Sequence, residues 1–365
     1  MQKKRLFAAI TAVALSGAML VGCTTASNPA STNEPAPTSA APEAPEWQSK
    51  LTDDGRLKEP AKIIFSTASN AVLDITAPLW ADQLGILKKY GITMEVQNVA
   101  TTAAVPLLAT GQVDVILGGL NAGLFNAVYS GSDLKVVGPN NYQDPNTTIG
   151  FYTSNKVTGG KLTTENLKGQ TVASSQGTQG ITMVALLDLL KSLDLKLDDV
   201  KVTTMPQTDQ VVALQTGAIA LGTPSPAGTL ALIEAKEATW AARQIPEGWP
   251  VVVYMYGPSL LKDRPEVGAA FLAAMRELYR DYLTPGYSEN PEVVSAIAKA
   301  TGQTEEAIQQ STEFIFTSEL AIPDDYISRM DSAWRLVPGQ LASDKPMTTD
   351  QIVDTDFMKY VNGLG

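Results

Sequence analysis

"LLATGQVDVILGGLNAG", residues 107–123, joins a helix end at Thr-Gly to an apolar strand and then to a loop of small and polar residues. The same order returns in "ALQTGAIALGTPSPAG", residues 213–228. A chain that repeats strand–helix–strand units forms parallel sheets joined by right-handed crossovers. The repeat therefore predicts an α/β protein with two lobes.

The rest of the chain agrees with this architecture. Strand and helix signals alternate from residue 62 and restart near residues 147–153. We expect each lobe to be a mostly parallel sheet flanked by helices. A ligand of an open α/β sheet lies beyond the carboxyl ends of the strands, so loops of both lobes should meet in one cleft. The chain should cross between the lobes near residues 148–153 and again near 251–257.

Several segments have helical spacing. Residues 77–91 are predicted to form one helix that ends at Gly91, because glycine readily takes the left-handed conformation after a helix. Pro265 stands where the first turn of a helix accepts proline. The apolar residues of that helix recur on one face and should be core: Val267, Phe271, Met275, Leu278 and Tyr282. Further helices are predicted at 291–300, 304–318 and 323–335.

Composition excludes several classes of chemistry. The net charge of −11 argues against a nucleic-acid partner. The chain has no histidine and one cysteine, which excludes Ser-His-Asp and Cys-His catalysis and zinc sites built from these residues. Nucleotide and calcium motifs are absent from the sequence. We therefore expect no metal, no cofactor and no catalytic residue.

Two Ser-x-x-Lys matches keep one enzymatic alternative open. They join Ser132 to Lys135 and Ser259 to Lys262. This spacing occurs in some serine acylases, where a Lys-Thr-Gly motif accompanies it. That motif is missing from the sequence. A lipid-anchored Ser-Lys hydrolase is therefore the less favoured hypothesis.

The beginning of the chain has the pattern of an export signal. A basic start, Lys3 to Arg5, precedes an uncharged run from Leu6 to Val21. That run is somewhat short for a retained membrane helix, which needs about 20 apolar residues. The quartet "LVGC", residues 20–23, resembles the bacterial lipobox, which implies that Cys23 is acylated. Several acyl chains on one residue anchor firmly, because each buried CH₂ contributes about 0.8 kcal/mol.

A segment rich in Pro, Ser, Thr and Ala follows the cysteine and should be a disordered tether. The folded part should begin between Trp47 and Pro60. The expected organisation is a lipoprotein signal peptide at 1–22, the tether at 23–46, the first part of lobe 1 at 47–150, lobe 2 at 151–252, and the second, mostly helical part of lobe 1 at 253–365.

The order of motifs resembles that of solute-binding lipoproteins of bacterial ABC importers, in the branch for nitrate, sulfonates, taurine and thiamine-pyrimidine precursors. The matching stretches are "APLW" (77–80), "KKYGITMEV" (88–96), "LLATGQVDV" (107–115), "SDLKVVG" (132–138), "LTTENLKGQTVAS" (162–174), "ALQTGAI" (213–219) and "LKDRPEVGAAFLAAMRELY" (261–279). The family often has aspartate where this chain has Ala220, whereas Asp114 is kept in the first lobe. The thiamine-precursor branch often has histidine where this chain has Thr76, which weakens that assignment.

The resemblance implies a two-lobed periplasmic-binding-protein type II fold. It also implies an extracytoplasmic, lipid-anchored bacterial protein, not an enzyme, that captures a small organic or oxyanion nutrient by hinge closure. Its partners would be an ABC permease and its ATPase, and the protein would be a monomer. A ligand-sensing lipoprotein that signals to a membrane partner stays open as an alternative.

The family's ligand contacts lie in the loops that follow the strands. The matching positions here are Ser66, Thr67, Asn70, Gly119, Asn121 and Tyr142 in the first lobe, and Gln176, Gly177, Thr178, Gln179, Thr223 and Ser225 in the second. Ser, Thr and Asn also cap helices, so a structural role stays open for them.

Other residues at the same edge carry two interpretations each. Asp74 and Asp144 could bind an amine or remain capping or solvated carboxylates. Trp80 and Tyr142 could stack on a ring or pack in the core. Because these loops contain no Lys or Arg, we expect a small ligand that is neutral, zwitterionic or weakly anionic.

Overall fold

The computed structural model describes residues 44–71 and 73–365 of the chain. The predicted signal peptide, Cys23 and all but the last three residues of the predicted tether lie outside the described residues. The first element is a short 3-10 helix, η1 (Glu46–Lys50). From Pro45 onward the chain forms one compact unit.

The first sheet has six strands in the order β11-β4-β10-β3-β1-β2. Their bounds are β1 (Ala61–Thr67), β2 (Ile92–Asn98), β3 (Val115–Gly118), β4 (Lys135–Gln143), β10 (Pro250–Tyr256) and β11 (Phe314–Ile315). β1 pairs in parallel with β2 and β3, and β10 runs antiparallel between β3 and β4. The first four strands therefore share one direction, and their carboxyl ends meet at one edge.

The second sheet has five strands in the order β7-β6-β8-β5-β9. Their bounds are β5 (Gly150–Ser154), β6 (Thr171–Ser174), β7 (Lys201–Thr204), β8 (Leu221–Gly222) and β9 (Ala238–Arg243). β6 pairs in parallel with β7 and β8, whereas β5 is antiparallel to β8 and β9. The two sheets confirm the predicted two-lobed architecture, with β10, β11 and β5 as the strands that run against the majority.

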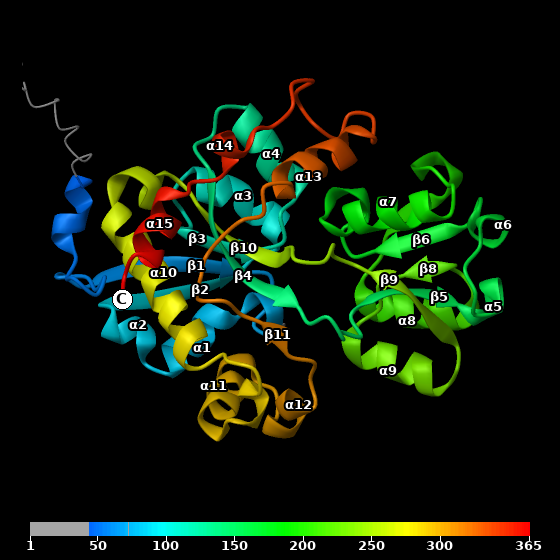
Figure 1. Cartoon of the computed structure of the whole chain (residues 1–365), viewed down its shortest axis with the longest axis horizontal. Coiled ribbons are helices and arrows are strands. Elements are labelled where there is room, and N and C mark those ends of the chain that lie inside the picture. Colours follow the sequence, from blue (N-terminus) through cyan, green and yellow to red (C-terminus); the bar gives the residue numbers. More distant parts are fainter. Residues whose placement is uncertain (1–43, 72) are drawn as a thin grey trace, which may run out of the picture. The chain divides into compact units, whose positions relative to one another are not determined.

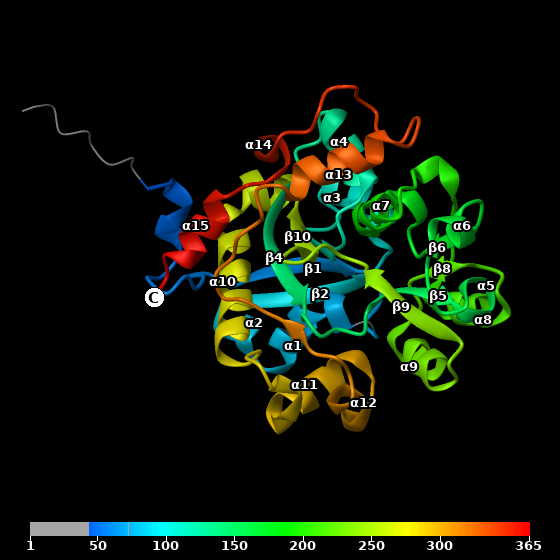
Figure 2. The same ribbon diagram turned by 45° about the vertical axis from the view of Figure 1, so that its right-hand side comes forward.

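Helices cover both faces of each sheet (Figures 1 and 2). In the first lobe they are α1 (Ala77–Gln83), α2 (Ile86–Lys89), α3 (Thr101–Ala109), α4 (Ala122–Tyr129), α10 (Pro265–Asp281), α11 (Pro291–Thr301), α12 (Glu305–Gln309), α13 (Tyr326–Arg335), α14 (Thr349–Ile352) and α15 (Asp356–Asn362). In the second lobe they are α5 (Asn155–Thr158), α6 (Thr164–Leu167), α7 (Thr182–Ser192), α8 (Gln207–Thr216) and α9 (Pro226–Glu234).

The long helix α10 forms as its sequence predicts. Pro265 occupies its first turn, and a complete apolar face is buried: Val267, Phe271, Met275 and Leu278. Tyr282 follows the last helical residue and is only partly buried. This helix packs against η1, α1, α2 and α15, and it forms much of the core of the first lobe.

Two helix predictions need correction. The segment 77–91 is broken at Gly85, whose φ of +73° separates α1 from α2. The helix predicted at 304–318 ends at Gln309, because β11 then pairs with β4. A strand of two residues gives too short a pattern to be recognised in the sequence.

The crossings between the lobes lie before the predicted positions. The chain leaves β4 at Gln143 and enters β5 at Gly150, and it returns between Arg243 of β9 and Pro250 of β10. The segments 144–149 and 244–249 are therefore the connections. The range 251–257, predicted as a crossing, is instead almost all β10, which is fully paired in the first sheet. Residue 252, predicted as the end of lobe 2, lies within that strand.

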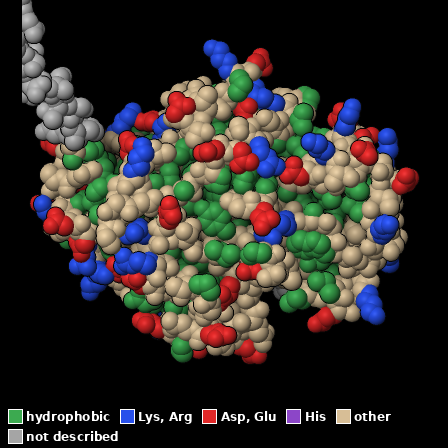
Figure 3. All heavy atoms as spheres, in the orientation of Figure 1, with side chains coloured by type: hydrophobic (Ala, Val, Ile, Leu, Met, Phe, Trp, Pro, Cys, Tyr) green, Lys and Arg blue, Asp and Glu red, His purple; other side chains and the backbone are tan. Residues whose placement is uncertain are grey.

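Charged side chains of both signs are mixed over the face of the molecule shown in Figure 3. A basic surface that could follow a phosphate backbone is not seen on this face. Among the described residues, no helix is both long and apolar enough to span a membrane.

Candidate functional site

The carboxyl edge of the first sheet lies against the second lobe. Asn121, just after β3, forms an isolated antiparallel bridge with Gly180, just before α7. A Cβ on Gly119 would lie 3.9 Å from Ile181 Cγ2 and 4.0 Å from Gln176 Oε1. The structure thus brings together the predicted residues Gly119, Asn121 and Gln176, which come from different lobes.

Three predicted contact residues use their side chains for local structure. Asn121 caps α4, since its Oδ1 accepts from Leu124 N–H at 3.2 Å and its Nδ2 donates to Gly119 O at 3.3 Å. Ser225 caps α9 by accepting from the N–H of Gly228. Thr67 donates its hydroxyl to Ile75 O at 2.9 Å. The capping interpretation therefore holds for Asn121 and Ser225.

The loop that follows β6 is shaped by Gly177. Its φ is +56°, and a Cβ there would lie 2.5 Å from Thr204 Oγ1. The hydroxyl of Ser174 donates to Gly177 O at 3.0 Å. This turn leaves Gln176 and Thr178 partly buried and Gln179 exposed. Thr223 follows β8 and is fully buried.

Buried polar atoms without a partner gather near the carboxyl ends of β1 and β4. They are Ser66 Oγ, Asn70 Oδ1, Asn141 Oδ1 and Gln143 Oε1. Ser66 and Asn141 are completely buried, at 0% exposure each. Buried polar groups almost always have a partner, so a concentration of unpaired ones at a single edge indicates a place for a ligand. Ser66 and Asn70 were predicted from the sequence, whereas Asn141 and Gln143 were missed.

Asp74 lies in the loop that crosses this edge. Its backbone oxygen accepts from the side-chain amides of Asn140 and Asn141, at 3.0 Å each. Its carboxyl has no ion-pair partner among the described residues. Burial raises the pKa of Asp74 to about 6, and its own backbone N–H partly opposes this shift. Asp74 as a whole is half-buried, although its carboxyl is largely surrounded by protein. A carboxylate withdrawn from water is costly unless something compensates its charge.

The side chain of Asn140 is held in place by two buried tyrosines. Its Oδ1 accepts from Tyr254 at 2.8 Å and from Tyr279 at 2.7 Å, and the two phenol oxygens are 2.6 Å apart. All three side chains are buried. This cluster therefore holds β4 and the Asp74 loop in a defined position.

The other predicted residues at this edge have structural partners. The phenol of Tyr142 donates to Ala321 O at 3.2 Å, and burial raises its pKa to about 12. Asp144 accepts from the N–H of Asn146 at 2.6 Å within the first crossing. Trp80 is buried in the core at 1% exposure, as the packing interpretation predicts.

Arg243 at the end of β9 was missed in the sequence. Its guanidinium donates to Pro145 O at 3.1 Å and to the backbone oxygens of Gln143 and Asp144 at 3.3 Å each. A residue next to the second crossing thus holds the first crossing. Because β9 carries no loop motif, its sequence gave no reason to suspect this contact.

A second set of contacts joins the lobes through α13. Arg329 Nη2 lies 2.6 Å from Asp188 Oδ2 on α7, and its guanidinium lies 4.9 Å from the ring centre of Trp249. Gln340 Nε2 donates to Thr178 O at 3.4 Å. These contacts hold α13 beside α7.

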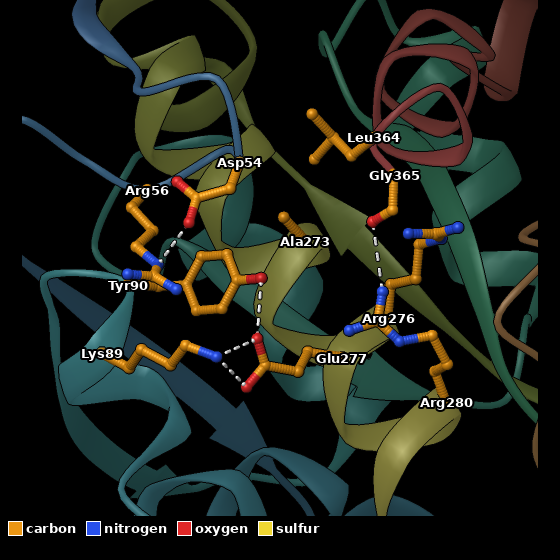
Figure 4. Close-up of a pocket in the computed structure, with 10 residues that line it drawn as sticks. All are labelled: Asp54, Arg56, Lys89, Tyr90, Ala273, Arg276, Glu277, Arg280, Leu364 and Gly365. Carbon is orange, nitrogen blue, oxygen red and sulfur yellow. Dashed lines mark hydrogen bonds and ion pairs between the residues drawn. The ribbon is translucent and has the colours of Figure 1, made fainter.

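A cavity of ≈ 200 Å³ opens elsewhere, before the amino ends of β1 and β2 (Figure 4). Its lining consists of Asp54, Arg56, Lys89, Tyr90, Ala273, Arg276, Glu277, Arg280, Leu364 and Gly365. Its charges are largely paired internally, as in Lys89 with Glu277 at 2.6 Å and Arg56 with Asp54 at 2.9 Å. Burial, together with the charge of Glu277, raises the pKa of Tyr90. None of the predicted ligand contacts lines this cavity, and we assign it a structural role.

The Ser-x-x-Lys matches do not form serine–lysine pairs in the described part of the chain. Ser259 donates to Asp114 Oδ1 at 2.5 Å, and Arg264 binds the same oxygen at 2.7 Å. Lys262 pairs instead with Asp133, at 2.8 Å. Lys135 donates to backbone oxygens of α14. Within residues 44–71 and 73–365, no three His, Cys, Asp or Glu side chains are placed to hold a metal ion.

Comparison with known proteins places this geometry in context. The model of a family described as NMT1/THI5 like matches residues 73–285. No curated protein sequence matches the chain.

Solved structures share the fold at low identity. The alkanesulfonate-binding protein SsuA from Xanthomonas axonopodis pv. citri, bound to MOPS, has a TM-score of 0.57 and 16% identity over 80% of this chain and 98% of its own. The periplasmic nitrate-binding protein NrtA from Synechocystis PCC 6803 has a TM-score of 0.57 and 15% identity over 83% and 88%. The desulfurization enzyme DSZB has a TM-score of 0.53 and 15% identity over 82% and 98%. The fold is therefore that of periplasmic solute-binding proteins, and at least one enzyme shares it.

Proposed function

The chain belongs to the NMT1/THI5-like family, and from this premise we propose that it is the solute-binding component of an ABC importer. In this role it captures a small organic or oxyanion nutrient of the sulfonate, taurine, nitrate or pyrimidine class. It then delivers the solute to a permease that works with an ATPase. The observation that carries the proposal is the meeting of the carboxyl-end loops of both sheets at Asn121, Gly180 and Gln176.

Closure of the two lobes is the proposed binding step. Two short segments, 144–149 and 244–249, connect the lobes. Each core can stay packed while such connections bend. A solute that contacts both lobes then favours the closed form, since only differential contacts shift the equilibrium. Small-angle scattering should show a smaller radius of gyration at saturation, and an unchanged radius would argue against closure.

A thermal-shift screen tests the proposal directly. The panel contains nitrate, sulfonates, amino-sulfonates, pyrimidines and aromatic acids. A bound solute at a hundred times its Kd stabilises the protein by about 2.7 kcal/mol. Variants of the exposed Gln179 should weaken binding without loss of stability. Asn121→Ala is a poorer probe, because removing its cap costs about 1 kcal/mol. If no solute of these classes stabilises the protein, the proposed function fails.

Attachment to the cell membrane is part of the proposal. Residues 1–22 would be removed, Cys23 would carry the acyl chains, and residues 23–46 would form the tether to a monomeric, extracytoplasmic binding unit. The lipobox-like "LVGC" supports this. Cys23→Ala should release the protein from membranes or leave its precursor unprocessed. A variant that stays membrane-bound with its leader removed would contradict the anchor.

An enzyme is the alternative that one observation favours, because a desulfurization enzyme shares the fold. Recovery of the bound solute after long incubation distinguishes the two functions. A binding protein returns the solute unchanged, whereas a turned-over product would replace transport by catalysis. A sensing role would instead be indicated if no permease and ATPase were encoded beside the gene.

A further inference from the structure

Two unpaired side-chain atoms of β4, near the Asp74 loop, are hydrogen-bond acceptors. The amide nitrogen of Asn141 donates to Asp74 O at 3.0 Å, and that of Gln143 donates to Ile149 O at 3.2 Å. These donations fix which end of each amide is the carbonyl. The unpaired atoms, Asn141 Oδ1 and Gln143 Oε1, are therefore acceptors. A ligand that satisfies these two oxygens must donate hydrogen bonds to them.

The same place carries a negative charge without a counter-charge. The carboxyl of Asp74 has no Lys or Arg partner in the described part of the chain. The guanidinium of Arg243 at the nearby crossing donates to backbone oxygens through its two terminal nitrogens, and its Nε is buried without a partner. The pKa of Asp74 is shifted by burial and its own backbone, without a contribution from any charged side chain. Asp74 therefore has no ion-pair partner among the described residues, and two unpaired amide oxygens lie on the strand that holds its loop.

This place is connected to the region where the lobes meet. Val252 of β10 pairs with Asn141 of β4, and Val253 pairs with Gly118 of β3. Gly119 is therefore level with Asn141, two strand spacings away, or about 10 Å. Gln176 and Ile181 of the second lobe approach Gly119. The Asp74 loop and the place where the lobes meet therefore lie at the same edge of the first sheet.

We propose that Asp74 and Asn141 form the subsite for a protonated amine, an ammonium or amidinium group, of the solute. The proposal rests on the solute-binding function and specifies the chemistry of its ligand. The carboxylate supplies the counter-charge, and the amide oxygen of Asn141 accepts a second N–H. Charge-assisted hydrogen bonds of this kind are stronger than neutral ones. The cluster of Asn140, Tyr254 and Tyr279 holds both groups in place.

Matched pairs of solutes test the proposal. Titration calorimetry compares 2-aminoethanesulfonate with ethanesulfonate, and 4-aminopyrimidine with pyrimidine, on the wild type and on Asp74→Asn. We expect the amine-bearing member of a pair to bind at least tenfold more tightly than its partner. Asp74→Asn should remove that advantage and leave the affinity for the amine-free member unchanged. Asp82→Asn changes a carboxylate on α1 whose pKa burial also raises, and it lies in neither connection; it is the matched control and should change neither affinity.

The outcomes separate this proposal from the function on which it rests. If amine-free solutes bind as tightly as their partners, or if Asp74→Asn keeps the advantage, the amine subsite is refuted and solute binding stands. If no member of either pair binds, the amine subsite is also refuted. The wider solute screen then decides the function itself. Circular dichroism of each variant confirms that a lost affinity does not arise from unfolding.

Discussion

Asp74→Asn should make the free protein more stable at neutral pH, although it removes a proposed ligand contact. The carboxyl of the half-buried Asp74 has a pKa of about 6, against 3.8 in the unfolded chain. That difference corresponds to roughly 3 kcal/mol of differential stability between the protonated and ionised forms. Asparagine has nearly the same shape and carries no charge, so it removes the cost of the ionised form.

The sign of the pH dependence follows from the raised pKa. The folded state binds the proton more tightly than the unfolded state, so the contribution of Asp74 to stability is full below about pH 4. It is lost as the pH rises through about 6. The variant should therefore match the wild type near pH 4 and exceed it by up to about 3 kcal/mol above pH 7.

Thermal unfolding between pH 4 and pH 8 measures this difference. With an unfolding entropy of about 2.1 cal/mol/K per residue, 3 kcal/mol raises the midpoint of a protein of this size by roughly 4 °C. The gain should survive 1 M salt, because its cause is burial and salt screens only interactions between charges. A variant that is less stable at pH 7.5, or whose difference from the wild type does not change with pH, would refute the reasoning.

Three further substitutions have defined expectations. Arg329→Ala removes the ion pair with Asp188. Because both side chains are more than a third exposed, we expect less than about 1 kcal/mol of lost stability. Small-angle scattering should nevertheless show a larger radius of gyration for the unliganded variant, and an unchanged radius of gyration would mean that this contact does not hold the lobes together. Glu277→Gln breaks the ion pair with Lys89 in the cavity of Figure 4. It should lower the free energy of unfolding, measured with denaturant, by about 1–3 kcal/mol and leave the solute affinity unchanged. A loss of solute affinity would give that cavity a functional role. Gly177 has a positive φ, and Gly177→Ala would place a Cβ 2.5 Å from the hydroxyl of Thr204. The substitution should lower the stability of the folded state by about 1–3 kcal/mol, measured by thermal unfolding. A neutral effect would mean that the loop can relax.

The sequence was sufficient for the architecture because the relevant signals are local. A helix ending at Thr-Gly, a strand and a polar loop occur once in each half, and both copies fold as predicted around β3 and β8. The position of the crossings is a tertiary property. The apolar residues at 250–256 are typical of a strand, but this pattern does not predict that the strand lies between β3 and β4.

The site was predicted only in part, because a loop residue's type does not reveal where its hydrogen bonds go. Asn121 and Ser66 are both polar residues at strand ends, yet one caps a helix and the other is buried without a partner. Asn141 lies in a paired strand and so was not considered. The pair of asparagines at 140 and 141, which follows the apolar residues of the strand KVVGPNNYQ, was the available signal.

The insertion of β10 also has a consequence for how the molecule folds. β10 is separated from β4 by residues 144–249, so its pairing with β3 and β4 must close a loop of that length. All strands of the second sheet, in contrast, come from residues 150–243. Pairing over a long intervening segment carries a larger loop-closure cost and is slow. The second lobe can therefore complete its sheet first, while β3 and β4 of the first lobe each keep an unpaired edge until β10 joins them. Refolding should therefore show a fast phase from the second lobe, followed by a slower phase as β10 completes the first sheet.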